Sequence, residues 1–347
     1  MPLRKMTALL GSAVLLISAG ALTAGAAQES GLADKPYTIS ETVAMTVSAN
    51  GKKYDLHEKA LFVDLNGDDK FTSADARLLL RMAAKLDPLP EEIAPIDLNG
   101  DGRFQSTDAR LALRYTARLD KYYCTAEDEI VSGFVKKENG KTAYLNAIGN
   151  FTYGDVEIGG KTYRFNPQGE MVTGWVNSGL DSYNYGSDGA LRKSTADVNF
   201  TYDANGVASA KTLNHDTFHV YLCGILKRNG ASVESIYRYV NGNFRYKYYD
   251  KGAPEDMAIR ILKNGRGACY DFANLTKYLL EAAGYECRIV VGDSFNPNNG
   301  SEHDWVLVKV NGVWRHMDTQ RGYYLKTDAQ MRAAGYGWNS SGLPAAV

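Results

Sequence analysis

A thiol, an imidazole and a carboxylate follow one another in the C-terminal part of the chain, as Cys269, His303 and Asp318. These are the groups that nucleophilic acyl transfer needs. A thiolate attacks a carbonyl, an imidazole takes and returns the proton, and a carboxylate fixes the imidazole tautomer and stabilises imidazolium. The sequence therefore predicts an active site in which Cys269 is the nucleophile, His303 is the general base and Asp318 orients the base.

The nucleophile is expected at the start of a helix. Cys269 stands just before the apolar-periodic residues 272–280, which are typical of an amphipathic helix. Unpaired backbone N–H groups and the positive end of the helix dipole favour a thiolate there. The N–H of Cys269 is also a natural donor to an oxyanion. Gly265 and Gly267 let the preceding turn pass close to a substrate.

The base and its carboxylate are expected on neighbouring strands. Residues 303–310 and 313–318 have strand-like sequences, and the Asn-Gly pair at 311–312 is a strong signal for a two-residue hairpin turn. Two adjacent antiparallel strands then present His303 and Asp318 side by side.

Two neighbouring side chains, His316 and Asp304, leave alternatives open for the site. His316 shares a strand face with Asp318 and competes with His303 as the base, whereas Asp304 falls on the face opposite His303. The non-catalytic alternative for His303 is a core histidine whose hydrogen bonds are satisfied.

The cysteine count allows a further alternative. The chain has 4 cysteines, and an even number in an exported protein permits full disulfide pairing, in three connectivities. Cys223 and Cys287 lie in apolar stretches and are expected to be small core residues. The pairing state of Cys124 is not predicted.

These motifs resemble the transglutaminase-like core, the papain-like fold of transglutaminases and many bacterial thiol peptidases, over residues 212–335. The resemblance implies an α+β domain that acts on peptide or amide carbonyls through Cys269, His303 and Asp318, without a catalytic cofactor. Asp304 departs from the family, which more often has a small residue there. The matching segments are 267–269 (Gly-Ala-Cys), 284–292 (a following strand), 303–305 (His-Asp-Trp) and 312–319 (Gly-Val-Trp to Asp-Thr).

A second pattern is a duplicated loop rich in oxygen ligands. Residues 64–75 recur 33 residues later as residues 97–108, and each copy leads into a predicted helix. Side-chain oxygens at loop positions 1, 3, 5 and 12, with a backbone carbonyl at position 7, form a ligand set for Ca²⁺. The predicted calcium ligands are Asp64, Asn66, Asp68, Lys70 and Asp75 in the first loop and Asp97, Asn99, Asp101, Arg103 and Asp108 in the second.

Two loops that are each followed by one helix resemble a dockerin, over residues 58–118. Asp75 and Asp108 replace the glutamate of a standard EF-hand, and Asp69 replaces its glycine. The resemblance implies two calcium ions and docking to a cohesin module of a cellulosome scaffoldin; a calcium-stabilised pair without a partner is the alternative. The partner-contacting residues that it implies are Ser73, Ala74, Ser106 and Thr107.

Aromatic and glycine motifs repeat between these two regions. Tyr-x-Phe-x-x-x-Gly at 163–169 returns 20 residues later as Tyr-x-Tyr-x-x-x-Gly at 183–189. Each unit is too small to bury its own face, which indicates a stack of hairpins. Together with Met-Val-Thr-Gly-Trp at 171–175, the pattern resembles choline-binding and glucan-binding cell-wall repeats, which implies either a spacer or a site for a cell-wall glycan.

The N-terminus has the pattern of an export signal. Arg4 and Lys5 precede an apolar stretch at residues 9–22, and Ala-Gly-Ala at residues 24–26 supplies a cleavage site. We therefore expect residues 1–27 to be a signal peptide and the protein to be secreted, with an uncleaved membrane anchor as the alternative. The net charge of −1 and the lack of basic clusters give no support for a nucleic-acid partner.

The 347 residues as a whole predict a multidomain protein: a small α-helical dockerin, a β-hairpin repeat segment and an α+β papain-like transglutaminase core. We expect a secreted peptidase or amidase that is docked to a cellulosome. The alternatives are a protein-crosslinking transglutaminase and a non-catalytic binding module that assists polysaccharide degradation. The sequence contains no recognisable paired-carboxylate motif of a glycosidase. The expected segments are 1–27, signal peptide; 28–57, N-terminal extension of unknown role; 58–118, dockerin; 131–207, repeats; and 212–335, catalytic domain.

Overall fold

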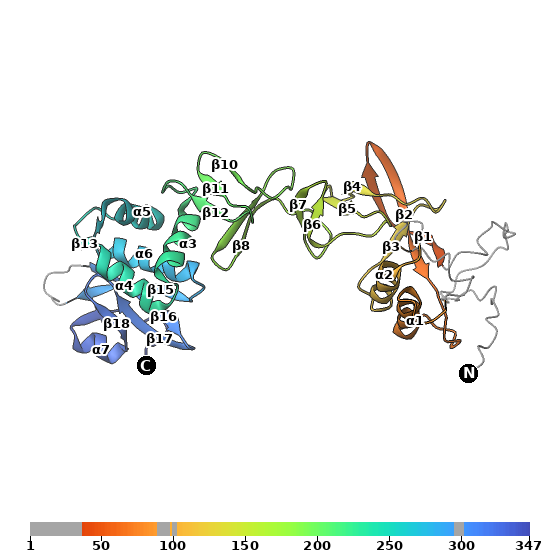
Figure 1. Ribbon diagram of the computed structural model, residues 1–347. Helices are drawn as coiled ribbons and strands as arrows, with labels where there is room; N and C mark the ends of the chain where they lie inside the picture. The colour runs from red at the N-terminus through yellow and green to blue at the C-terminus, as the bar shows by residue number, and fades with distance from the viewer. Residues whose placement is uncertain (1–36, 89–97, 99–102, 295–301) are drawn as a thin grey trace, which may run out of the picture. The chain divides into compact units, whose positions relative to one another are not determined.

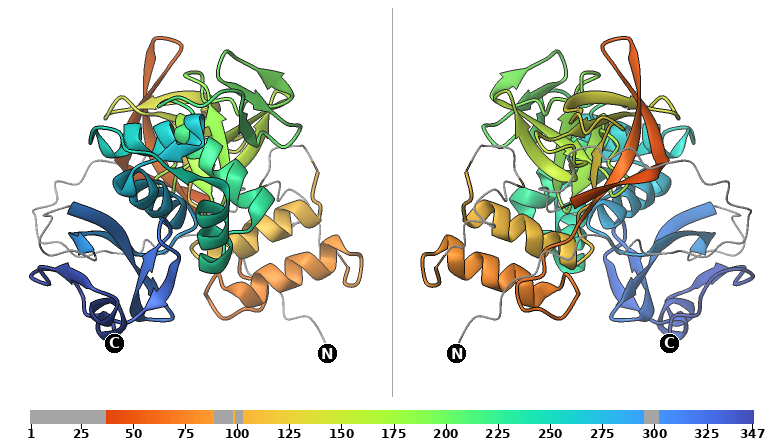
Figure 2. Two further views of the ribbon diagram at one scale, coloured as in Figure 1. Left: turned by 90° about the vertical axis from the view of Figure 1, so that its left-hand side faces the viewer. Right: turned by 90° about the vertical axis from the view of Figure 1, so that its right-hand side faces the viewer.

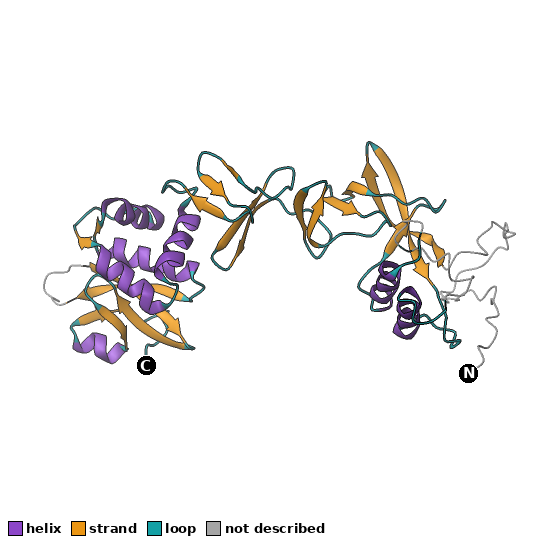
Figure 3. Cartoon of the chain, viewed as in Figure 1, coloured by secondary structure: helices purple, strands orange, loops and turns teal. Residues whose placement is uncertain are grey.

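The computed structural model describes residues 37–88, 98, 103–294 and 302–347 (Figures 1 and 3). The expected signal peptide lies outside the described residues. The chain divides into two compact units between Val172 and Thr173. Within the described part of the chain, no helix has the length and apolar character needed to cross a bilayer.

A five-stranded antiparallel sheet opens the first unit. Its first two strands join at Asn50 and Gly51, which both have positive φ, as a type I′ turn requires. Much of the segment expected as an N-terminal extension is therefore part of this sheet. The strand order is β3-β2-β1-β4-β5, with β1 (Tyr37–Ala49), β2 (Lys52–Leu61), β3 (Tyr122–Cys124), β4 (Gly133–Lys137) and β5 (Thr142–Leu145).

Two helices interrupt this sheet along the chain. The helices α1 (Ser73–Ala83) and α2 (Ser106–Thr116) come between β2 and β3. Leu79 of α1 and Ala112 of α2 are completely buried, in one apolar cluster with Tyr122 of β3. The helical pair is thus inserted into the sheet rather than added at one end of it.

The repeat segment folds into short hairpins, as its period predicts. Within the first unit a ring contact packs one hairpin on the next, where Phe134 meets Tyr163 edge to face with centroids 5.1 Å apart. After β4 and β5 come the hairpins β6 (Gly154–Ile158) with β7 (Lys161–Phe165) and β8 (Gly174–Ser178) with β9 (Asp181–Tyr185), then a three-stranded sheet of β10 (Thr195–Ala196), β11 (Phe200–Tyr202) and β12 (Ala208–Ala210).

Helices cover one face of a second five-stranded antiparallel sheet in the second unit (Figures 1 and 2). The strand order is β18-β17-β16-β15-β19. The covering helices are α3 (Phe218–Asn229), α4 (Val233–Asn243), α5 (Pro254–Asn264) and α6 (Cys269–Ala282). The strands are β15 (Cys287–Ser294), β16 (Glu302–Val310), β17 (Val313–Asp318), β18 (Tyr323–Lys326) and β19 (Tyr336–Trp338). The short helix α7 (Asp328–Ala333) comes between β18 and β19 along the chain. A separate pair of short strands, β13 (Arg245–Tyr246) and β14 (Arg266–Gly267), flanks α5 in the sequence.

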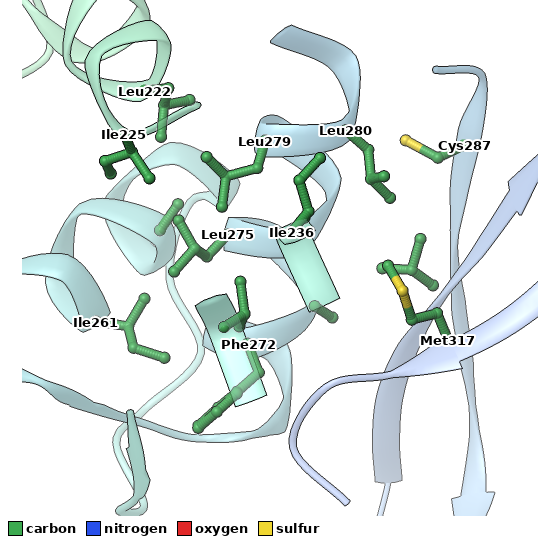
Figure 4. Packing of buried hydrophobic residues seen from close by; sticks show 14 of the residues in the cluster. Leu222, Ile225, Ile236, Ile261, Phe272, Leu275, Leu279, Leu280, Cys287 and Met317 are labelled. Atoms are coloured by element: carbon green, nitrogen blue, oxygen red, sulfur yellow. The ribbon is translucent and has the colours of Figure 1, made fainter. Parts of the chain in front are cut away.

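Alternate residues of β16 face two different cores. Val306 and Val308 join Leu279 of α6 in the core beneath the helices, where Figure 4 shows Leu279 among side chains from neighbouring helices. Trp305 belongs to the core on the opposite face, together with Tyr336 of β19. The period-two alternation of β16 thus separates its polar residues onto two faces as well.

The hairpin between β16 and β17 sets the register of these polar residues. The predicted Asn-Gly turn is confirmed, since both of its residues have positive φ, 50° and 81°. Val306 pairs with Met317 across the two strands. His303 and Asp318 consequently lie on the same face, as diagonal neighbours within reach of each other.

Candidate active site

Cys269 is the first residue of α6, as its sequence context predicts. The turn before it passes through Gly267, where an added Cβ would lie 2.6 Å from the Cβ of Asp271, so only glycine fits. Cys269 is 7% exposed. Because it opens the helix, its backbone N–H has no partner within the helix and remains a candidate oxyanion donor.

The disulfide alternative for Cys269 does not hold in this structure. Cys223, Cys269 and Cys287 are free thiols. Cys287 belongs to the core beneath the helices, as its apolar surroundings predict, and burial raises the pKa of its thiol to about 12. Cys287 is therefore expected to be an inert thiol. Cys269, unlike Cys287, lies at the start of a helix.

Asp271 fixes the start of α6. Its carboxylate accepts the N–H of Ala268 at 2.6 Å and pairs with Arg260 at 2.6 Å. Burial raises the pKa of Asp271, while the Ala268 N–H and the Arg260 guanidinium act in the opposite direction. These contacts hold the turn that presents Cys269.

The imidazole of His303 is buried between the other two predicted residues. Its Nε2 lies 2.6 Å from Oδ2 of Asp318, and the Cys269 thiol lies 3.9 Å from the neighbouring carbonyl oxygen of Glu302. Burial alone would lower the pKa of His303, but interactions with Asp318 and Cys269 outweigh it and raise this pKa to about 9. Since Asp318 engages Nε2, the nitrogen left to exchange a proton with Cys269 is Nδ1.

Asp318 is held by four donors. Its Oδ1 accepts the N–H groups of Gln320 and Arg321, both at 3.0 Å. Its Oδ2 accepts from His303 and from the hydroxyl of Tyr336, the latter at 2.7 Å. Burial and the charge of Asp318 raise the pKa of Tyr336, which therefore stays a donor. Sequence reasoning missed Tyr336, because it follows Asp318 by 18 residues and carries no motif beyond a short aromatic strand.

His316 is engaged elsewhere and does not compete for the thiol. It is completely buried. Its Nδ1 accepts the indole N–H of Trp305 at 2.8 Å, and its Nε2 lies 2.8 Å from Oδ1 of Asp328. Burial lowers the pKa of His316, and Asp328 opposes this effect. Because both nitrogens of His316 are occupied, His303 remains the candidate base.

Asp304 lies on the face of β16 opposite His303, as the alternation predicts. Its Oδ2 lies 3.2 Å from the ammonium of Lys251, which also pairs with Glu302 and lies over the ring of Tyr270, 5.6 Å from its centroid. Burial raises the pKa of Asp304, and Lys251 lowers it. Asp304 and Glu302 thus tie the segment before α5 to the start of β16 through Lys251.

The first predicted calcium loop lies within the described residues. Asp64 accepts the N–H of Asp69 at 2.8 Å, and Asp69, at the glycine position of a standard loop, has a φ of 59°. Asp75 is completely buried and accepts the N–H groups of Leu65 at 2.9 Å and Thr72 at 2.8 Å. The last predicted ligand of the loop therefore also caps α1.

The donor set of this loop fits calcium, because a hard cation takes oxygen ligands alone. No three acidic, histidine or cysteine side chains in the described parts of the chain form a metal-binding group by themselves. The calcium set depends on an amide and a main-chain carbonyl as well. The predicted set would comprise side-chain oxygens of Asp64, Asn66, Asp68 and Asp75 and the carbonyl of Lys70.

Only part of the second loop is described. Arg103 is exposed. Asp108 is buried and accepts the N–H groups of Leu98 at 2.9 Å and Gln105 at 2.7 Å, which repeats the contacts of Asp75 33 residues earlier. The Arg81–Asp87 ion pair recurs in the same way as Arg114–Asp120. The predicted ligands Asp97, Asn99 and Asp101 lie outside the described residues.

The predicted partner-contacting residues are accessible. Ser73 and Ala74 begin α1, Ser106 and Thr107 begin α2, and all four are exposed.

The aromatic rings of the repeat segment pack on one another. Trp175 is 43% exposed and meets Phe200 edge to face with centroids 4.7 Å apart. The guanidinium of Arg192 lies over the ring of Tyr202, 5.8 Å from its centroid.

Sequence profiles of two known families match parts of the chain. The profile of the dockerin type I domain matches residues 62–115, and that of the transglutaminase-like superfamily matches residues 217–319. The second match contains Cys269, His303 and Asp318, but not Tyr336. Among curated proteins, none matches the chain.

Solved structures align with parts of the chain. A choline-binding domain of Streptococcus pneumoniae is 28% identical over 22% of this chain and 94% of that chain, with a TM-score of 0.21. A second pneumococcal choline-binding domain is 24% identical over 25% of this chain and 50% of that chain, also with a TM-score of 0.21. A candidate cysteine protease of Cytophaga hutchinsonii is 20% identical over 38% of this chain and 45% of that chain, with a TM-score of 0.28.

The two profile matches identify a domain at each end of the described chain. Dockerin type I domains generally bind calcium and the cohesin modules of scaffoldins, and the transglutaminase-like superfamily contains cysteine peptidases and acyltransferases. The chain is a mixed α/β protein with several β-hairpins that carries a dockerin type I domain and a transglutaminase-like domain.

Proposed function

We propose that the protein is a thiol peptidase or amidase in which Cys269, His303 and Asp318 form the catalytic triad. The observation that carries this proposal is a buried His303 that contacts Asp318 and interacts with Cys269, with a pKa raised to about 9. A histidine with this pKa is protonated at neutral pH, so it can stabilise a thiolate that forms beside it and can protonate a leaving group. A domain that only binds has no physical need for this combination.

The thiolate of Cys269 attacks the carbonyl carbon of a peptide or amide, and the carbonyl π electrons move to oxygen as the S–C bond forms. The N–H of Cys269 stabilises the oxyanion. The imidazolium of His303 gives a proton to the leaving nitrogen, the C–N bond breaks, and a thioester remains. Water then attacks the thioester with His303 as base, which releases a carboxylic acid and restores the thiolate.

We further propose that the dockerin domain delivers this activity to a scaffoldin outside the cell. Bound calcium would neutralise the clustered carboxylates of each loop and tie it to the helix that follows. The exposed starts of α1 and α2 would contact a cohesin, and the repeat segment would serve as a spacer or hold a cell-wall glycan. Export by residues 1–27 completes this proposal.

Alkylation tests the thiolate directly. At about pH 6 an ordinary thiol is mostly protonated, so iodoacetamide should label Cys269 much faster than Cys287, as peptide mapping of the full-length protein would show. His303→Ala should slow Cys269 labelling on the order of 10-fold to 100-fold, because it removes the stabilising imidazolium. His215→Ala, at an exposed histidine that pairs with Glu255, is the matched control and should leave the rate unchanged.

Labelling of Cys269 no faster than that of Cys287 would refute the triad and favour the non-catalytic binding module. If the thiolate is present, peptides incubated with and without a primary amine distinguish the two reactions by product mass. A free acid identifies a hydrolase, whereas an amine adduct identifies the crosslinking alternative.

A further inference from the structure

The second unit holds a further histidine–aspartate pair, of which the histidine is buried and the aspartate is partly exposed. His316 on β17 is completely buried, and its Nε2 lies 2.8 Å from Oδ1 of Asp328. Asp328 begins α7, beyond the residues that the transglutaminase-like profile matches. The proposed chemistry gives this second pair no role, although it shares the sheet face of His303 and Asp318.

Trp305 connects the two pairs. Its indole N–H donates to Nδ1 of His316 at 2.8 Å. Its ring stacks against the imidazole of His303, with centroids 5.9 Å apart and 24° between the planes. It also meets Tyr336, the donor to Asp318, edge to face at 5.1 Å. Because Trp305 is only 1% exposed, it has no room to turn without displacing the groups around it.

Asp328 selects the tautomer of His316 that Trp305 requires. An indole N–H can only donate, so Nδ1 of His316 must be an acceptor, and the ring proton then lies on Nε2, where Asp328 accepts it. Asp328 is itself held, because its backbone N–H donates to the carbonyl of Ala346 at 2.7 Å. Trp338 also meets the ring of His316 edge to face, with centroids 4.7 Å apart.

We propose that His316 and Asp328 are positioning residues, which hold Trp305 and, through it, the imidazole of His303 in the orientation that transfers a proton. This inference rests on the proposed thiol activity and deepens it. It also gives residues 320–347 a role in the site, since they supply Asp328 to this pair and Tyr336 to the first.

Substitutions in the full-length protein test the connection through Trp305. Trp305→Phe keeps a ring beside His303 but removes the N–H donor, and His316→Gln removes the acceptor at the Nδ1 position. Each should lower kcat on a peptide substrate on the order of 10-fold to 100-fold, since a misplacement of about 1 Å costs as much as 10²-fold. KM should change little. His316→Asn, whose side-chain oxygen lies near the Nδ1 position, should restore most of the activity.

A double-variant cycle separates positioning from a general packing effect. If His316 acts through Trp305, His316→Gln should reduce kcat no further in the Trp305→Phe background. Reductions that multiply, or a loss confined to KM, would overturn the proposal. Where His316→Gln fails to fold, Trp305→Phe alone removes the same hydrogen bond and must still lower kcat.

A measurement without substrate keeps this proposal distinct from the proposed function. The chain has 4 tryptophans and 5 histidines, so labelling of these residue types gives few NMR signals. His316→Gln should shift the indole N–H signal of Trp305 and the imidazole signals of His303. If these shifts occur but no peptide is turned over, the proposed activity fails and the positioning stands. If kcat and the His303 signals are unchanged, the positioning fails and the activity stands.

Discussion

His303 is buried beside two groups that can carry negative charge, and this sets the pH range of the proposed activity. Burial would lower its pKa, but Asp318 and Cys269 raise it to about 9, above an ordinary value of about 6.5. The stabilisation from charged His303 is therefore fully present below about pH 6.5 and is lost as pH rises through about 9. We expect kcat/KM for a peptide to fall above about pH 9, with the free energy of unfolding decreasing over the same range.

Two aspartate variants check the origin of this limit. Asp318→Asn removes the charge that favours imidazolium and should move the upper limit of the pH–rate profile to lower pH. The control is Asp181→Asn. Asp181 lies on the β8–β9 hairpin and pairs with Lys227 of α3, so this change should leave the upper limit in place. An unchanged limit in Asp318→Asn would mean that another group controls the profile.

Tyr336 is the residue whose removal should most directly disturb Asp318. Tyr336→Phe deletes a hydroxyl that donates to Oδ2 at 2.7 Å, the same oxygen that His303 contacts. A hydrogen bond to a charged group is worth about 1.5–3 kcal/mol, so kcat/KM should fall roughly 10-fold to 150-fold. Tyr323→Phe is the matched control, since Tyr323 packs on Tyr336 at 5.4 Å. Equal rates for the two variants would contradict a role for this hydroxyl.

At the scale of elements, Gly292 allows the strands β15 and β19 to pair closely beside the candidate site. It lies on β15 between His303 of β16 and Trp338 of β19. A Cβ here would lie 2.1 Å from the carbonyl oxygen of Gly337 and 2.9 Å from the ring of Trp305. Gly292→Ala should therefore separate β19 from β15 and destabilise the fold by at least about 1–3 kcal/mol, as chemical denaturation would measure. Gly337→Ala has open space and should cost far less.

The elements that carry the triad could be predicted because their signals are local. The start of α6 at Cys269, the Asn-Gly turn and the alternation of β16 each follow from a few adjacent residues. Tyr336 and Asp328 could not be predicted, because their roles arise from contacts across 18 and 12 residues that no periodicity records. The pairing of β1 with β4, about 90 residues apart in the chain, is beyond such patterns for the same reason.

At the scale of the whole molecule, α1 and α2 contact the sheet of the first unit, so calcium bound at the dockerin loops would also stabilise part of that sheet. The backbone N–H of Leu61, on β2, donates to the hydroxyl of Tyr115 on α2 at 3.3 Å. Tyr122 of β3 packs against the same tyrosine ring, with centroids 5.6 Å apart, and Ile148, from the first repeat, joins the apolar cluster of the helices. The helices therefore share their apolar core with the end of β2 and with β3, while the rest of the sheet packs in a core of its own.

Calcium removal from the full-length protein should consequently loosen part of the sheet along with α1 and α2. A ligand present at 100 times its Kd stabilises the folded state by about 2.7 kcal/mol, and a chelator withdraws that stabilisation from every element that unfolds with the site. Hydrogen exchange should rise in β3 and at the end of β2, whereas α6 in the second unit serves as the internal reference. Asp68→Asn should reproduce the rise in hydrogen exchange. The control is Asp155→Asn, which removes an exposed ion pair with Arg164 on the β6–β7 hairpin and should leave hydrogen exchange unchanged. If exchange rises in α1 and α2 while β3 keeps its protection, the helical pair unfolds alone and the shared core does not couple it to the sheet.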